Sequence, residues 1–159
     1  MKKWGLLFTL LLFVVGCQEK AVTMPEDIPD FVQQSDITAI DWDRKAVHFG
    51  NLNNIVGNKD KIGVIGADTP SLNTQKWMWH LWGDAIHEDT KLTVVGYHKA
   101  SNEIYPLLVD GWHTTLGGPN NGANAHAPTS VKVPKAGDWA VLVYADNHYF
   151  DTLVYTIND

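Results

Sequence analysis

"DWAVLVYADNHYFDTLVYTI", Asp138 to Ile157, carries the clearest fold signal in this 159-residue chain. Two runs rich in Val, Leu and aromatic residues flank the short polar sequence ADNH. Successive side chains of a strand point to opposite faces, so Trp139 and Val141 share one face of the first run. Asp146 and Asn147 tolerate the positive φ angles that a two-residue hairpin turn requires. The stretch predicts a β-hairpin, and the last two strands of immunoglobulin-like sandwiches have this pattern.

From Ile37 to the end of the chain, short apolar runs alternate with turn-forming residues. The runs are rich in Val, Ile, Thr, Tyr and Trp, which strands prefer, and none has a helical period. The expected strands cover residues 46–49, 61–66, 76–82, 91–99, 104–112, 130–134, 138–145 and 149–157. We therefore predict one domain over residues 37–159, an all-β, immunoglobulin-like antiparallel β-sandwich of about seven or eight strands.

The run "WMWHLW" is the densest group of aromatic residues in the chain. A period of two places Trp77 and Trp79 on one face and His80 and Trp82 on the other. Because both faces are mostly apolar, we expect a central strand that is covered on both sides, with His80 half-buried and hydrogen-bonded. The alternative is that one tryptophan, Trp82 beside the following turn, stays exposed and stacks on sugars or other flat ligands.

The N-terminus predicts export. Two lysines precede the apolar run Trp4–Val15, which is too short to span a bilayer and has the length of a signal-peptide core. The run ends in "VVGC", which resembles a bacterial lipobox, and Cys17 is the only cysteine in the chain. We predict a lipoprotein signal peptide over residues 1–16 and acylation of Cys17, palmitate included. The alternative is an ordinary cleaved signal followed by an incidental cysteine.

Residues 17–36 are polar and contain two prolines, so we expect the lipidated cysteine and a flexible tether there. A lone thiol cannot form a disulfide within the chain. Acyl chains would hold the domain at the extracytoplasmic face of the cell membrane. Without Lys2 and Lys3, 10 basic residues face 18 acidic ones, a net charge of −8. This balance argues against nucleic acid as a partner, because its binding depends on cationic contacts to phosphate.

The longest connection is the Gly/Asn-rich segment His113–Ser130. Loops of this length in a compact domain are usually functional or mobile. We expect it to contact a sugar, a peptide or a protein partner, the alternative being a structural Ω-like loop over one end of the sandwich. The candidate residues are Trp112, His113, Asn120, Asn121, Asn124 and His126.

No catalytic motif is present in the sequence. The seven histidines form no HxH, HxxxH or HExxH pattern, and no serine lies in GxSxG. We therefore predict no catalytic residue, no metal and no cofactor. The alternative is a metal-binding or hydrolytic envelope protein, which would require the histidines to converge in space. The four histidines concerned are His80, His98, His113 and His126.

Several segments together resemble a known family. "KIGVIGA", "QKWMWHLWG", "LGGPNNGANAHAPTSVKVPKAGDWAVLVY" and the lipobox are similar to small firmicute lipoproteins of unknown function. The resemblance covers Ile37–Asp159 and implies an immunoglobulin-like sandwich and a membrane-anchored location, but no activity. We expect a lipid-anchored, extracytoplasmic binding module for an envelope glycan, peptide or protein, and not an enzyme. The sequence leaves the oligomeric state open.

Overall fold

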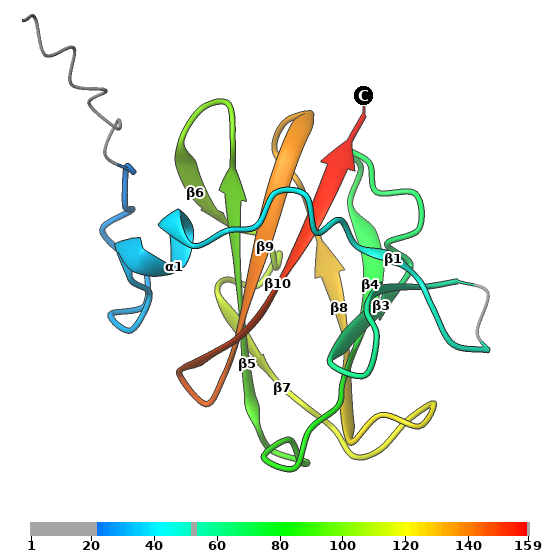
Figure 1. Ribbon diagram of the computed structural model, residues 1–159. Coiled ribbons are helices and arrows are strands. Elements are labelled where there is room, and N and C mark those ends of the chain that lie inside the picture. Colours follow the sequence, from blue (N-terminus) through cyan, green and yellow to red (C-terminus); the bar gives the residue numbers. More distant parts are fainter. Residues whose placement is uncertain (1–21, 52–53, 159) are drawn as a thin grey trace, which may run out of the picture.

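The computed structural model describes residues 22–51 and 54–158, so Cys17 and the expected signal peptide lie outside the described residues. Its ten strands form two antiparallel sheets that pack face to face, and one short helix precedes them (Figure 1). This is the sandwich that the sequence predicts. In the described part of the chain, no helix combines the length and the hydropathy needed to cross a membrane.

The first sheet has the strand order β1-β2-β3-β4-β8. In the second, β10, β9 and β5 lie side by side, and β6 and β7 pair with successive halves of the far edge of β5. The elements are α1 (Gln34–Thr38), β1 (Val47–His48), β2 (Ile55–Asn58), β3 (Ile62–Ile65), β4 (Gln75–Leu81), β5 (Lys91–His98), β6 (Glu103–Pro106), β7 (His113–Thr115), β8 (Ala125–Val131), β9 (Gly137–Ala145) and β10 (His148–Ile157).

The connections are those of an immunoglobulin-like sandwich. Neighbours β3-β4-β8 occupy the places of strands A, B and E, and β10-β9-β5-β6 those of G, F, C and C′. The chain crosses between the sheets after β4 and again after β8. The sequence analysis did not anticipate β2 and β7, and it was wrong to treat residues 113–130 as one connection, because β7 and most of β8 lie within them. β2 and β7 are short, and β2 contains Gly57, a residue that strands disfavour.

The C-terminal hairpin forms as expected. β9 and β10 pair along their whole length, from Gly137 opposite Ile157 to Ala145 opposite His148. Asp146 and Asn147 have φ angles of 46° and 70°, which are those of a type I′ turn. A β-bulge after Tyr149 shifts the register.

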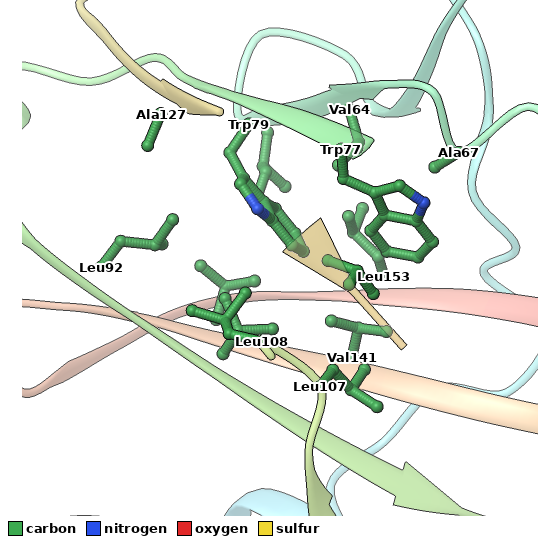
Figure 2. Close-up of a cluster of buried hydrophobic side chains, with 14 of the residues drawn as sticks. Val64, Ala67, Trp77, Trp79, Leu92, Leu107, Leu108, Ala127, Val141 and Leu153 are labelled. Atoms are coloured by element: carbon green, nitrogen blue, oxygen red, sulfur yellow. The ribbon is translucent and has the colours of Figure 1, made fainter. Parts of the chain in front are cut away.

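Three tryptophans fill the space between the sheets. Trp77, Trp79 and Trp139 are at most 1% exposed. Figure 2 shows the first two pointing from β4 toward Val141 and Leu153 of the second sheet. The Trp79 indole donates a hydrogen bond to the Thr129 hydroxyl at 2.9 Å. The row therefore belongs to the core, as the period of two predicts.

The segment before β1 covers the outer face of the second sheet. Phe31 packs edge-on against Tyr144, with the ring centres 5.3 Å apart, and Trp42 lies over Tyr97. Val32 is buried in the same cluster. A tether was expected over residues 17–36, but its described part, 22–36, packs on the sheet because its apolar side chains cover otherwise exposed aromatic rings. That part thus belongs to the folded domain.

Candidate functional site

Two glycines shape the outer face of the first sheet. The strand register places Gly57, Gly63, His80 and His126 in one row across β2, β3, β4 and β8. A Cβ at Gly63 would lie 2.7 Å from Cζ of Phe49, so only a glycine lets that ring lie on the sheet. Gly63 thus leaves room on the sheet for the Phe49 ring, and this place is called the seat below.

Trp82 borders the seat on the other side. It follows β4, and its ring meets Phe49 at 5.7 Å between centres and 66° between planes. Its indole N–H donates to the carbonyl of Gly122 at 2.8 Å. The two rings are both only partly buried, and they form a corner that is open to solvent.

A tight turn inside the Gly/Asn-rich segment holds this arrangement. Asn120 and Ala123 exchange backbone hydrogen bonds around Asn121 and Gly122, whose φ angles are 49° and 82°. These are the angles of a type I′ turn, for which Asn-Gly is the favoured pair. The Asn124 side chain accepts a hydrogen bond from the Gly83 N–H at 3.0 Å and ties the turn to the end of β4.

His80 supports the corner from below and is fully buried. Its Nδ1 lies 3.1 Å from the carbonyl of Met78, and its Nε2 lies 3.0 Å from Nδ2 of Asn121. Since the carbonyl can only accept, Nδ1 carries the proton and Nε2 accepts from the amide. Burial lowers the pKa of His80, which favours this neutral form. Its ring stacks between those of Trp82 and His126.

The corner opens into a pocket of about 290 Å³. Two aromatic rings, two side-chain amides, one aliphatic side chain and a glycine line it, and none of them is charged. The lining residues are Phe49, Gly50, Asn51, Ile55, Trp82 and Asn121. Such a pocket can stack on a ring and exchange hydrogen bonds with it, but its lining contains no nucleophile and no acid or base.

The six residues expected to form the site separate into two places. Asn121 lines the pocket, Asn120 and Asn124 hold its turn, and His126 packs beside His80. Trp112 lies on the other sheet, where it is buried and donates to Asp27 at 3.1 Å. His113 is exposed on β7.

Sequence reasoning missed Phe49, Asn51 and Ile55. None of them belongs to a recognisable motif, because they reach the pocket only through the pairing of β2 with β3. The available signal was a glycine inside each of these strands, which marks a close approach by another part of the chain.

The histidines do not converge as a chelating group. Of the four named above, His80 and His126 are neighbours, with ring centres 6.3 Å apart. Their planes are nearly parallel, so their in-plane nitrogens do not aim at one point, and each Nδ1 is bonded to a carbonyl. Over residues 22–51 and 54–158, no group of three or more His, Cys, Asp or Glu residues could hold a metal ion.

A second hollow of about 510 Å³ lies where the β9–β10 hairpin meets the turn after β4. Charged side chains of both signs line it, among them Asp84 and Asp146. The ammonium of Lys61 already covers its Phe150 ring, 4.1 Å from the ring centre. Charged groups line this hollow and an ammonium already contacts its Phe150 ring, so the uncharged Phe49–Trp82 pocket is the better candidate for stacking on a neutral ring, although Tyr149 in the hollow is 50% exposed.

Comparison with known proteins identifies a family and a fold. A family described as a domain of unknown function (DUF4871) matches residues 31–155. The crystal structure of a "Putative Lipoprotein from Bacillus anthracis" is similar over 82% of this chain and 96% of that chain, with a TM-score of 0.65 and 21% sequence identity. No curated protein matches the chain. At this identity the structural likeness supports the sandwich fold alone.

Proposed function

The chain belongs to the DUF4871 family, and on that premise we propose that it is a lipid-anchored, extracytoplasmic binding module that performs no covalent chemistry. The ligand or partner, which we take to be an envelope glycan, peptide or protein, contacts the pocket between Phe49 and Trp82. The observation that carries the proposal is this corner of two partly exposed rings, seated on Gly63 and fastened by hydrogen bonds. Exposed aromatic surface promotes aggregation, so a soluble domain that keeps such rings exposed usually uses them in binding.

The anchor rests on the sequence and on the similar fold. The lone Cys17 follows a short apolar run in a lipobox-like context. A protein of similar fold bears the name of a lipoprotein, which is consistent with the same location for this chain. Cys17→Ala should release the protein from the membrane fraction. Unchanged detergent partitioning of Cys17→Ala would sink the lipoprotein part of the proposal.

The position of the pocket suits an anchored receptor. The described N-terminal segment, from Val22, packs on the outer face of the second sheet. The pocket lies on the outer face of the first sheet, and Figure 1 shows these two faces on opposite sides of the molecule. A chain tethered before Val22 would thus direct its pocket away from the point of attachment.

A thermal-shift screen of residues 18–159 against envelope glycans, short peptides and divalent metals tests the binding part. A ligand at 100 times its Kd adds about 2.7 kcal/mol to the free energy of unfolding, which raises Tm by several degrees. Trp82→Ala, which weakens binding about tenfold, should reduce the stabilisation to about 1.4 kcal/mol and so roughly halve the shift, whereas Phe150→Ala, in the larger hollow, should keep it. A ligand whose shift is unchanged in Trp82→Ala, or a metal that acts through His80 and His126, would contradict the proposal.

A further inference from the structure

We infer that the pocket takes one ring of a neutral saccharide. This inference rests on the proposed function, since it names the class of ligand for the same site. Three features of the pocket carry it: the absence of charge in its lining, the exposed faces of its two aromatic rings, and one amide oxygen fixed at its rim.

The first feature is the neutral lining. None of the six lining residues is ionisable. His80 lies directly behind the pocket, and burial lowers its pKa, which favours the neutral ring that accepts from the Asn121 amide. The mature chain has a net charge of −8, which repels anionic polymers. A charged ligand would lose its hydration here without gaining an ion pair, so the geometry favours an uncharged one.

The second feature is the direction of the rings. The indole N–H of Trp82 already donates to the carbonyl of Gly122. A ligand therefore contacts the carbon atoms and the face of the ring and receives no hydrogen bond from it. Aromatic faces carry partial negative charge and attract the slightly positive C–H groups that line one face of a pyranose ring. The corner with Phe49 provides a second apolar wall at 66° to the first.

The third feature is the amide of Asn121. Its Nδ2 donates to His80, which fixes the side chain and leaves Oδ1 to accept a hydrogen bond. A sugar hydroxyl is the donor that matches a neutral acceptor beside an apolar wall. Asn51, which is exposed, also lines the pocket and offers a second amide. The volume, about 290 Å³, is at the lower end of the range for ligand pockets, which suits one ring rather than several.

The test uses the full acylated chain in nanodiscs and saturation-transfer difference NMR. The neutral probes are maltotriose, cellotriose and tri-N-acetylchitotriose, and the charged probe is trigalacturonate. N-acetylphenylalaninamide serves as the peptide-like apolar probe. We expect at least one neutral trisaccharide to show transfer from the protein, strongest at the C–H groups of one ring, and trigalacturonate to show none.

Variants separate the contributions. Trp82→Ala should weaken the saccharide by about tenfold, as for other rings that lose an aromatic stacking partner. Asn121→Gly removes the amide and keeps the positive φ of the turn, so it should weaken binding several-fold; because buried His80 loses its hydrogen-bond partner, Tm should also fall by a few degrees. Phe150→Ala is the matched control and should leave the affinity unchanged.

The outcomes distinguish the inference from the function on which it rests. If N-acetylphenylalaninamide binds in a Trp82-dependent manner and no trisaccharide does, the pocket is a binding site but the saccharide inference is overturned. If trigalacturonate binds as well as the neutral probes, the argument from charge is overturned. If no probe contacts the protein in a Trp82-dependent manner, both the inference and the proposed site fail.

Discussion

The outer faces of the two sheets are both aromatic, but the chain covers one and leaves the other open. On the second sheet, residues 22–42 lie over Tyr97 and Tyr144, and Asp36 accepts a hydrogen bond from the Tyr144 hydroxyl at 2.9 Å. On the first sheet, Phe49 and Trp82 line a pocket of about 290 Å³ that the described part of the chain leaves uncovered. Aromatic rings on an outer face of this domain are therefore available to a ligand only where no other described segment packs on them.

The largest loss of stability is expected for a substitution in the core between the two sheets. Trp79 has no exposed surface, so Trp79→Ala removes a large ring and leaves a cavity. We expect the free energy of unfolding to fall by about 3–5 kcal/mol, measured by urea denaturation. A loss below about 1 kcal/mol would place the tryptophan row at the surface and remove the basis for comparing the two faces.

The second largest loss of stability is expected on the outer face of the second sheet, which residues 22–42 cover. Ile37 of α1 is 5% exposed and packs in the cluster under residues 22–42. Ile37→Ala should lower the free energy of unfolding by about 2 kcal/mol, because it opens the cover and leaves a small cavity. Thr38→Ala, at an exposed neighbouring position, is the control. Equal stability of both variants would show that the N-terminal segment is not part of the fold.

The open face should contribute little to stability. Trp82→Ala loses one hydrogen bond and a partly exposed ring, so we expect a cost of about 1 kcal/mol. The same variant should weaken, by about tenfold, the binding that the proposed function requires. A cost as large as that of Trp79→Ala would make Trp82 a structural residue and erase the contrast between the two faces.

The smallest effect concerns pH. Burial holds the pKa of His80 below its usual 6.5, so the unfolded chain binds more protons near that pH than the folded chain does. The stabilisation that depends on neutral His80 is complete above pH 6.5 and declines as the pH falls through the lower folded value. An NMR titration of the imidazole Cε1–H signals should show His80 titrating below 6.5. A normal or raised value would contradict the neutral, Asn121-bonded ring.

The sequence was sufficient for features that depend on near neighbours. The period of two placed Trp77 and Trp79 in the core, and the residues at 146 and 147 predicted the turn of the last hairpin. The pocket could not be predicted, because it depends on which strands pair. Phe49 reaches Trp82 because Gly63 of β3, the strand between β2 and β4, leaves room for the Phe49 ring. That position depends on the strand register and not on the composition.

The Gly/Asn-rich segment also shows that sequence alone could not predict which of its residues and neighbours meet in space. Its composition marked it as a candidate, and Asn121 does line the pocket. Trp112, adjacent to the segment in sequence, instead lies on the second sheet, because its backbone carbonyl accepts from Val94 of β5; there its indole donates to Asp27. A site expected to be continuous in sequence is therefore divided between the two faces.

The most direct test follows the indole N–H signals of Trp82 and Trp112 in one ¹H–¹⁵N spectrum, during titration with the probes named above. The two indoles report on the open and the covered face of the same molecule. We predict that the Trp82 signal moves with ligand concentration while the Trp112 signal stays in place. Movement of Trp112 alone, or of neither indole while a ligand raises Tm, would contradict the claim that the open face is the binding site.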